Sequence, residues 1–217
     1  MRNILQRIHL VVSAHFNPVY YVLKKDIKTI LDVGCGNGVN TKLLKIRLPE
    51  LVATGIDIYP PSIEYAKGSR VFKKVIKKDL SKSWSNSNKF DVVICLQLIE
   101  HLNEEVAIKL IDRLEKTSQK QIIFTTPIGS LDQGEVEGNV WQSHKSKFTP
   151  EFFIKRGYQT KNLGRRFFSS QEGIQSKDAD WLVKAILLFI DVLLTPVYWI
   201  APFLADHYFI AWKTYEE

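Results

Sequence analysis

Short apolar runs alternate with amphipathic stretches along the chain from residue 27 onward. The apolar runs are rich in β-branched residues and predict buried strands at 29–33, 52–57, about 75–76, 90–95 and 121–125. Between them, apolar residues recur at the spacing of one helix face and predict helices over 39–48, 60–67 and 104–116. Strands that alternate with helices in this way are typical of repeated βαβ units. The pattern therefore predicts an α/β fold built on a parallel sheet.

The pattern changes after residue 127, where a polar loop extends through residue 147. The tripeptide Thr149-Pro150-Glu151 combines an N-cap, a proline in the first turn and an acid close to the positive end of a helix. It predicts a helix that ends at Gly157. Two further strands are expected, at 158–166 and at 207–215.

The length and composition are those of one globular unit. The 217 residues, 45% hydrophobic and 24% charged, can bury one sizeable core and are few for two. We expect a single domain over 1–217, with a helical extension at 1–26 and an apolar helical insertion at 178–205. Cys35 and Cys95 are too few for a disulfide framework and lack partners at zinc-ligand spacing, so a cytoplasmic location is expected.

The chain is basic, with a formal net charge of +7. This charge favours anionic partners such as nucleic acid, phospholipid headgroups or acidic substrates, without choosing among them. The basic residues come in scattered pairs, which is typical of a solvated surface. Near the N-terminus, Arg7 and His9 interrupt an apolar stretch that no small-residue cleavage site follows. A surface helix is therefore expected there, rather than a signal peptide.

Three glycines stand at alternate positions where the first predicted strand turns into a helix. They are Gly34, Gly36 and Gly38, and Asp32 precedes them. Glycine removes the Cβ that would hold a ligand away from the backbone, and it permits the positive φ of a tight turn. A nicotinamide-binding loop has the spacing G-x-G-x-x-G, whereas here the third glycine comes one residue early and an acid precedes the first. The acid favours a cationic cofactor that has no phosphate.

Acidic residues also mark the ends of the next strands. Asp57 ends the second predicted strand, Asp79 ends the third, and Glu100 follows the fourth. Ligands of open α/β sheets bind outside the carboxyl ends of the strands. There, a carboxylate at the second strand can accept hydrogen bonds from both hydroxyls of a ribose, and one at the third can accept from an adenine amino group. The pattern predicts a nucleoside-containing cofactor.

With these residues, the chain resembles the class I S-adenosylmethionine-dependent methyltransferases over about residues 27–166 and the last strand. The resemblance is strongest to the small-molecule and quinone-type branch, whose motif after the fourth strand ends in Glu-His, as Glu100-His101 does here. It implies a Rossmann-like seven-stranded sheet with strand order 3-2-1-4-5-7-6 and an antiparallel last strand. It also implies S-adenosyl-L-methionine as the cofactor.

The resemblance assigns cofactor contacts position by position. Asp32, Gly34 and Gly36 would line the methionine portion, and Asp57 would hold the ribose. The adenine would meet Asp79 and its neighbour, and the backbone at the end of the fourth strand would meet the amino-acid tail. In chain order, the implied cofactor residues are Asp32, Gly34, Gly36, Asn37, Gly38, Asp57, Ile58, Asp79, Leu80, Leu96 and Gln97.

Two histidines are the candidates for catalysis. Methyl transfer from a sulfonium is an in-line displacement that needs alignment above all, and an oxygen acceptor must also lose a proton. His101 is the first candidate base, because it follows the fourth strand beside the implied cofactor and a histidine titrates near neutral pH. His144 is the second. The alternative for each is a structural histidine that bonds to the backbone.

A divalent metal is a further alternative. Some methyltransferases that the chain resembles, the ubiquinone-pathway O-methyltransferases and the small-RNA 2′-O-methyltransferases, bind a divalent metal through Glu-x-x-Glu-His. The RNA methyltransferases add a later histidine to this motif. The matching positions here are Gln97, Glu100, His101 and His144. The first acid is replaced by an amide, which removes a charge and weakens a site for a hard cation. We therefore expect no metal.

The most unusual stretch is the apolar segment 181–204. It is long enough for a membrane span, but a single crossing would separate the strand at 207–215 from the sheet it completes. Helical spacing puts four charged residues on one stripe: Lys177, Asp180, Lys184 and Asp191. We expect a helix in the headgroup layer or a shallow hairpin, whose interfacial aromatics would be Trp181, Tyr198, Trp199 and Trp212. The alternative is a helix packed on the sheet or at a dimer interface.

Together these features predict a methyltransferase that O-methylates a small amphiphilic or lipid-linked acceptor, peripheral to the cytoplasmic face of a membrane. The net charge leaves an RNA methyltransferase as one alternative, although no RNA-binding module or arginine-rich tail supports nucleic acid as a partner. A non-catalytic membrane-associated protein that retains the fold is the other. The sequence does not indicate the acceptor, the methylated atom or the oligomeric state.

Overall fold

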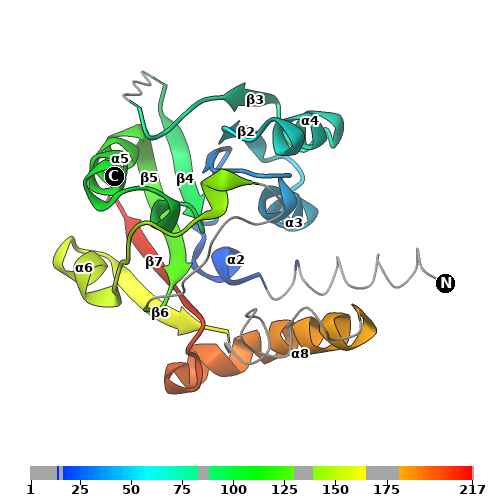
Figure 1. The fold of residues 1–217 in the computed structure, drawn as a ribbon, viewed down its shortest axis with the longest axis vertical. Helices are drawn as coiled ribbons and strands as arrows, with labels where there is room; N and C mark the ends of the chain where they lie inside the picture. Colours follow the sequence, from blue (N-terminus) through cyan, green and yellow to red (C-terminus); the bar gives the residue numbers. More distant parts are fainter. Residues whose placement is uncertain (1–13, 15–16, 83–87, 130–138, 165–180, 217) are drawn as a thin grey trace.

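A computed structural model describes residues 14, 17–82, 88–129, 139–164 and 181–216 of the chain. Its centre is a seven-stranded sheet of order β3-β2-β1-β4-β5-β7-β6. Strands β1 to β5 pair in parallel, and β7 runs antiparallel to both β5 and β6 (Figure 1). The strand order and the antiparallel last strand implied by the sequence are confirmed.

The strands agree closely with the apolar runs. They are β1 (Thr29–Val33), β2 (Val52–Asp57), β3 (Lys74–Lys77), β4 (Phe90–Leu96), β5 (Ser118–Pro127), β6 (Gln159–Leu163) and β7 (Tyr208–Thr214). The main difference is β5, which is longer at both ends than the predicted 121–125. Its pairing with β7 extends to Pro127 opposite Tyr208. Cross-strand partners on that side lengthen the strand beyond its apolar run.

Helices connect the strands and cover both faces of the sheet. The α-helices are α2 (Pro18–Val22), α3 (Val39–Arg47), α4 (Pro60–Gly68), α5 (Glu104–Thr117), α6 (Pro150–Lys155) and α8 (Trp181–Ile200). Short 3-10 helices are η1 (Ile99–His101), η2 (Val140–Gln142) and η3 (Pro202–Leu204). As predicted, Thr149 caps α6, accepting a hydrogen bond of 3.4 Å from the Phe152 amide, and the chain turns at Gly157 with φ +81°.

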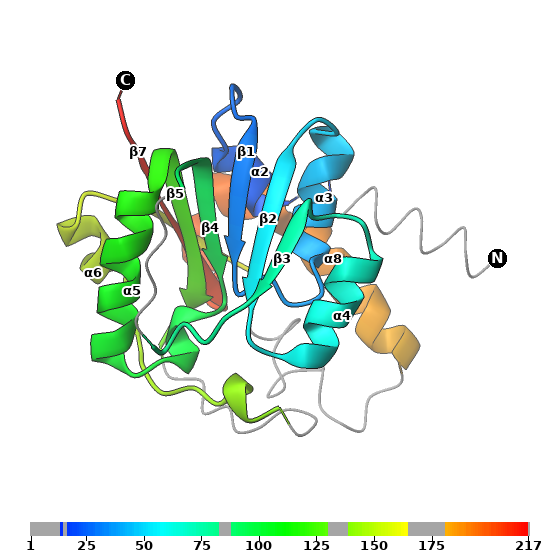
Figure 2. The same ribbon diagram turned by 90° about the horizontal axis from the view of Figure 1, so that it is seen from above.

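The core has two halves, one on each face of the sheet (Figure 2). On one face, α5 and α6 bury Leu110, Leu114 and Phe153 against the strands. On the other, α2, α3 and α8 bury Val19, Leu44 and Tyr198. The carboxyl ends of β1 to β4 meet between these layers, which is where open α/β sheets place a ligand.

The apolar segment before the last strand forms one continuous helix, α8, which ends before Pro202. The helix continues past Pro196 to Ile200, so a hairpin does not form. Asp191 is buried, not part of a solvent-facing stripe, while Lys177 and Asp180 lie outside the described residues. The inner face of α8 packs on the sheet, which is the alternative that the sequence left open. Among the described helices, none has the length and apolar character needed to cross a membrane.

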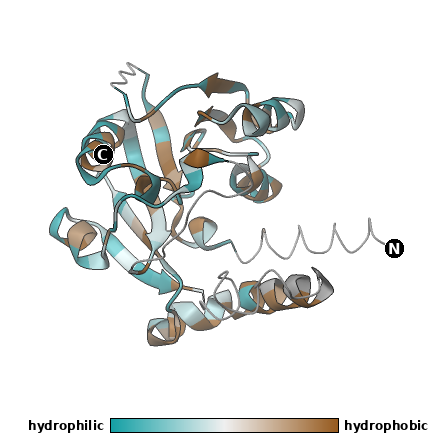
Figure 3. Cartoon of the chain, viewed as in Figure 1, coloured by the Kyte–Doolittle hydropathy of each residue, from teal (hydrophilic) through white to brown (hydrophobic). Residues whose placement is uncertain are grey.

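The expected interfacial aromatics are corrected in part, and the side chain of Trp181 lies outside what the structure describes. Tyr198 is buried against the sheet, and the Trp199 ring lies between those of Trp212 and Tyr21, with centroids 6.2 Å and 5.5 Å away. These rings fill the gap between α2, α8 and β7. Among the side chains of α8 that the structure describes, the exposed ones are aliphatic. Figure 3 shows apolar residues recurring along this helix.

Candidate active site

The glycine loop after β1 is docked on β2 by its backbone. The amides of Gly34 and Cys35 both donate to the carbonyl oxygen of Ile56, over 2.8 Å and 3.0 Å. Gly34, Gly36 and Gly38 all have positive φ, as the sequence predicts for a tight turn. A Cβ at Gly34 would lie 2.9 Å from the Leu98 side chain, whereas at Gly36 it would meet open space. The backbone at Gly36 is therefore accessible to a ligand.

Asp57 joins this loop to the end of β2. Its Oδ2 accepts a hydrogen bond of 2.7 Å from the Gly36 amide, and its Oδ1 accepts one of 2.9 Å from the Tyr59 amide. Each carboxylate oxygen has a second lone pair, so both can still accept a hydrogen bond from a ligand. The position fits the ribose contact that the sequence implies.

Asp32 is buried at the end of β1. Its Oδ2 accepts a hydrogen bond of 2.6 Å from the hydroxyl of Thr41 on α3. Burial raises the pKa of Asp32 to about 7, and the charge of Asp57 contributes to the same shift. A cation near this carboxyl group would favour its ionised form. The site therefore has an acid whose charge responds to a cationic ligand.

A pocket of about 140 Å³ brings together predicted residues from three strand ends. It is lined by Gly34 after β1, Asp57 and Ile58 after β2, and Asp79 and Leu80 after β3. His101 and Trp141 complete one side of it. Hydrogen bonds from Ser81 hold the pKa of Asp79 below its usual value, so this carboxylate is ionised at neutral pH.

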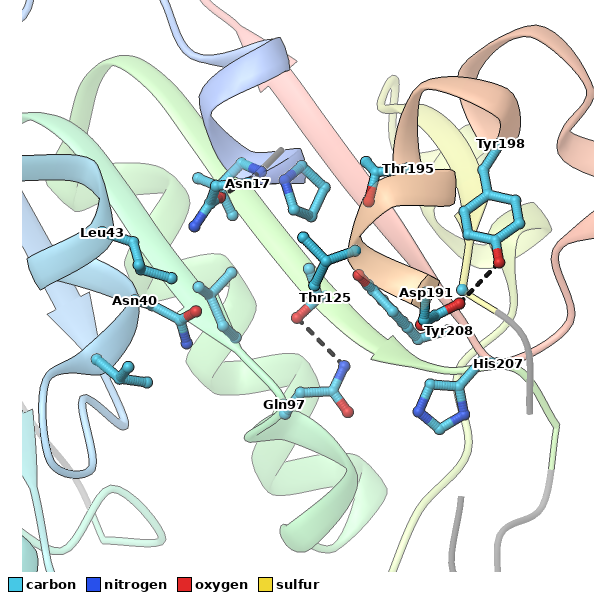
Figure 4. Close-up of a pocket in the computed structure, with 16 residues that line it drawn as sticks. Asn17, Asn40, Leu43, Gln97, Thr125, Asp191, Thr195, Tyr198, His207 and Tyr208 are labelled. Carbon is cyan, nitrogen blue, oxygen red and sulfur yellow. Dashed lines mark hydrogen bonds between the residues drawn. The ribbon is translucent and has the colours of Figure 1, made fainter. Parts of the chain in front are cut away.

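A second, larger pocket of about 480 Å³ begins at the end of β4. Leu96 and Gln97, two further predicted residues, line it together with residues of α2, α3, α8 and β7 (Figure 4). Gln97 has φ +51°, and its side chain donates to Thr125 Oγ1 over 3.2 Å. The left-handed backbone turns the chain sharply after β4, which places the Gln97 amide at the pocket wall.

The remaining predicted residues shape the loop between strand and helix. Asn37 is exposed, and its Oδ1 accepts a hydrogen bond of 3.1 Å from the Val39 amide at the start of α3. A Cβ at Gly38 would lie 2.5 Å from the Phe72 ring. Both residues therefore have local structural roles, and a direct contact of either with a cofactor stays a prediction.

His101 has an environment that the sequence did not indicate. It lies in η1, 8% exposed, with Nδ1 3.3 Å from the carbonyl oxygen of Ser143. Burial lowers the pKa of His101 to about 4, and the neighbouring His144 contributes. The expectation of a histidine that titrates near neutral pH is therefore wrong for His101. Its imidazole is neutral at pH 7 and is a weak base.

Glu100, His101 and His144 form a cluster whose ligand atoms all lie within 4.8 Å of one another. The two imidazole rings have centroids 4.9 Å apart. Within the part of the chain that the structure describes, Glu100 Oε1 is buried and has no hydrogen-bond partner. The segment that carries His144 is fixed here, because the amides of Lys145 and Ser146 both donate to the Glu100 carbonyl oxygen. A carboxylate and two imidazoles suit a divalent transition metal.

Several lining residues were not found from the sequence. Trp141 and Asn40 come from segments that carried no motif, and Asp191, Tyr198 and His207 flank the apolar segment or lie within it. The one available signal was the presence of an acid inside an otherwise apolar helix. Helical spacing could not predict that Asp191 is buried, because spacing shows which residues share a helix face but not whether that face points to the core or to solvent.

Comparisons with known proteins agree with this geometry. A family model described as a methyltransferase domain matches residues 30–120, which include the glycine loop, Asp57, Asp79 and the β4 end. The fold is also that of solved methyltransferases that carry S-adenosylhomocysteine. Residues 30–120 thus resemble the methyltransferase-domain family, and the fold is that of the class I S-adenosylmethionine-dependent methyltransferases.

Among solved methyltransferases, the plantazolicin methyltransferase in complex with S-adenosylhomocysteine has a TM-score of 0.57 at 19% identity, over 96% of this chain and 83% of that one. The magnesium protoporphyrin IX methyltransferase of Synechocystis, also with bound S-adenosylhomocysteine, has a TM-score of 0.53 at 13% identity, over 96% and 83%. At these identities, the similarity shows the fold alone.

Curated methyltransferases with similar sequences include an O-methyltransferase of ubiquinone biosynthesis from Haemophilus ducreyi. It is 29% identical over 46% of this chain and 46% of its own length. A malonyl-[acyl-carrier protein] O-methyltransferase of Acetivibrio thermocellus is 60% identical over 38 residues, 18% of this chain and 13% of its own length. The matches thus span less than half of these relatives.

Proposed function

We propose that this methyltransferase transfers the methyl group of S-adenosylmethionine to an oxygen atom of a small amphiphilic or lipid-linked acceptor. The observation that carries the proposal is the hydrogen bond between the Gly36 amide and Asp57. It couples the open backbone of the glycine loop to the carboxylate that would accept from the ribose. The names of the two curated relatives described above support an oxygen acceptor.

The cofactor would lie across the strand ends from the smaller pocket toward the larger. Its adenosine would meet Asp57, Ile58, Asp79 and Leu80, which line the smaller pocket. Its methionine portion would extend toward Gln97, at the wall of the larger pocket. The ammonium and sulfonium charges would favour the ionised form of Asp32. In this orientation, alignment of acceptor and methyl group supplies most of the rate enhancement.

The His101 and His144 pair has two candidate roles. A neutral imidazole can accept the proton of the acceptor hydroxyl, but the lowered pKa of His101 makes it a poor base at equilibrium. Together with Glu100, the pair could instead hold a divalent cation, for which the buried Oε1 of Glu100 has a free position. When bound, such a cation would lower the pKa of an acceptor hydroxyl. The described donor set fits it despite the amide at Gln97.

Contact with a membrane surface is the second part of the proposal. The outer face of α8 carries exposed aliphatic side chains from Val183 to Ile200, the last of them 87% exposed, and Phe203 follows at 83%. An apolar helix face of this kind can enter the headgroup layer. The net charge of +7 would add attraction to anionic lipid.

Two measurements test the activity. Purified protein should bind S-adenosylmethionine and S-adenosylhomocysteine, but not NADH, in calorimetric titrations. A strain without the gene should accumulate a metabolite that lacks the mass of one methyl group, and the purified protein should methylate that metabolite. Binding of NADH in place of S-adenosylmethionine would contradict the assignment.

A further inference from the structure

A third pocket, of about 470 Å³, adjoins the smaller pocket of the active site. Both pockets are lined by Ile58, Lys78, Asp79 and Trp141, which therefore stand between them. Because three of the residues that line the third pocket are lysines, we call it the basic pocket. A pocket of this size can hold a small organic group. A ligand in the basic pocket would lie directly beside the strand ends where the cofactor is placed.

The lysines of the basic pocket come from the end of β3 and the turn after it. Lys77 is the last residue of the strand, and Lys78 and Lys82 follow it. The Lys78 amide donates to the Asp57 carbonyl oxygen over 2.8 Å, which fixes the start of the turn against β2. Three lysines from one short segment thus line a single cavity at the edge of the sheet.

Asp79 offsets the charge of these lysines only in part. It is the one acid among the described residues that line the basic pocket. Its carboxylate accepts hydrogen bonds from the amide and the hydroxyl of Ser81, over 3.0 Å and 2.5 Å, and lies 3.8 Å from the Lys82 ammonium group. Three lysines therefore stand against one carboxylate that already has protein partners. The resulting excess of positive charge attracts an anion.

The cofactor does not account for these lysines. S-adenosylmethionine has no phosphate, and its one carboxylate belongs to the methionine portion, which the proposed function places toward Gln97. Its sulfonium and ammonium groups are cations, which lysines repel. Lysines on an edge strand can also prevent pairing with another sheet, and β3 is an edge strand. That explanation covers Lys74 and Lys77, but not Lys78 and Lys82, which lie beyond the strand.

Trp141 gives the basic pocket an apolar wall. Its backbone is fixed by Asn139, whose Oδ1 accepts from the Trp141 amide over 3.1 Å, and its ring centroid lies 6.1 Å from that of Tyr59. The Trp141 side chain is nevertheless 42% exposed, so part of the indole surface is available to a ligand. Trp141 also lines the smaller pocket together with His101. An elongated ligand would therefore have a path from the lysines past Trp141 toward His101.

We propose that the basic pocket binds an anionic group of the methyl acceptor, a phosphate or a carboxylate, while the oxygen to be methylated lies toward His101. Lys78 has the central position, because it alone of the three lysines lines both pockets. It selects acceptors that carry an anion at one end, and Trp141 contacts their apolar part. The inference rests on the proposed function, since it adds a negative charge to the same amphiphilic acceptor.

The test uses the full chain saturated with S-adenosylhomocysteine and three probes that differ in one group: 4-butylphenyl phosphate, 4-butylbenzoate and 4-butylbenzyl alcohol. In calorimetric titrations at low salt, one of the two anionic probes should bind at least about tenfold more tightly than the alcohol, the difference expected for one charge-assisted hydrogen bond. The tighter of the two identifies the anionic group. The preference should decrease as salt is added, because salt screens exposed charges.

Lys78→Gln should remove most of this preference and leave the affinity for the alcohol unchanged. Lys78→Arg keeps the charge and should retain the preference. The matched control is Lys74→Gln, which removes an exposed lysine of the same strand that does not line the basic pocket. It should behave like the wild type. Lys82→Gln should reduce the preference several-fold, and it remains informative if Lys78→Gln does not fold.

Two further measurements distinguish the source of the anion. Inorganic phosphate should bind at least about tenfold more weakly than the tighter anionic probe, because it has no apolar part to contact Trp141. Flotation with anionic liposomes should be the same for Lys78→Gln and the wild type. Equal affinity for inorganic phosphate would indicate a site for free phosphate, and a loss of flotation confined to Lys78→Gln would indicate a site for a lipid headgroup. Either result would overturn the inference.

The probe titrations can also contradict the inference directly. Equal binding of the three probes, tighter binding of the alcohol, no probe binding at all, or an unchanged preference in Lys78→Gln would overturn it. An equal loss of preference in Lys74→Gln and Lys78→Gln would do the same, because it would reflect the net charge alone. Failure of the wild type to bind S-adenosylhomocysteine would instead overturn the proposed function.

Discussion

The Asp57 carboxylate accepts a hydrogen bond of 2.7 Å from the Gly36 amide, across the gap between the ends of β1 and β2. This bond fixes the glycine loop relative to the second strand. A carboxylate in this position acts on a ligand in two ways. It would accept from the ligand directly, and it holds the backbone that the ligand would approach.

Substitution of Asp57 should therefore affect the cofactor strongly. Asp57→Ala should cost a net amount equal to about one hydrogen bond to a charged group, about 1.5–3 kcal/mol, so the Kd for S-adenosylhomocysteine should rise about 10-fold to 150-fold. Isothermal titration measures the change. Glu64→Ala, which removes an exposed acid of α4, is the matched control and should bind like the wild type. An unchanged Kd in Asp57→Ala would contradict the ribose contact.

The glycines differ in their tolerance of a side chain. Gly38→Ala introduces a Cβ at φ +82° and within 2.5 Å of the Phe72 ring, so it should lower the free energy of unfolding by about 1–3 kcal/mol. Gly68→Ala, in α4, meets no atom within 4 Å and should raise the free energy of unfolding by about 0.5–1 kcal/mol. Urea denaturation of the two variants compares them. Equal stability of both would argue against strain at Gly38.

Cofactor binding should depend on pH through Asp32. Burial raises the pKa of Asp32 to about 7, so this carboxyl group takes up a proton as the pH falls through that value. A cationic cofactor prefers the ionised form, and its affinity should fall by up to about tenfold for each pH unit below the pKa. The dependence should be weaker for S-adenosylhomocysteine, which has no sulfonium, and should be lost in Asp32→Asn. Titrations across neutral pH measure it, and a flat wild-type profile would be the contrary result.

The raised pKa of Asp32 should also make the free energy of unfolding of the cofactor-free protein depend on pH. A carboxyl group with a raised pKa binds protons more tightly in the folded state than in the unfolded state. The contribution of Asp32 is therefore favourable at low pH and is lost as the pH rises toward about 7. Asp32→Asn should flatten this part of the stability profile, which urea denaturation at several pH values would measure.

The exposed face of α8 should bind lipid. We expect the wild type to float with liposomes, more strongly when they contain anionic lipid. Ile190→Asp combined with Leu193→Asp should release the protein, because two charges enter the apolar face, while cofactor binding is retained. Ile154→Asp changes an isoleucine of α6 that is 54% exposed, and serves as the control. If the wild type shows no flotation, the membrane contact is wrong.

The cluster of Glu100, His101 and His144 should bind a divalent cation. Calorimetric titration of the chelator-treated protein with Mn²⁺ should show one site. His144→Ala should weaken that site at least about tenfold, the effect expected when one of three protein ligands is lost. His207→Ala removes a histidine outside the cluster and should leave Mn²⁺ binding intact. No Mn²⁺ binding in the wild type would leave the histidine pair with the proton-acceptor role alone.

The sequence by itself determined the order of elements and the residues at the strand ends. Buried parallel strands are continuous apolar runs and glycines in tight turns have few substitutes, so β1, β2 and the glycine loop lie where local pattern predicts them. Only the tertiary structure decided the environment of each polar group. The buried His101, whose pKa is lowered, lies against a segment some forty residues later, where the Ser143 carbonyl oxygen is 3.3 Å from its Nδ1. Likewise, helical periodicity groups Asp191 with other charges on one face, but the packing of α8 on the sheet turns that residue inward. Periodicity is a local property, whereas burial depends on which distant surface a helix face meets.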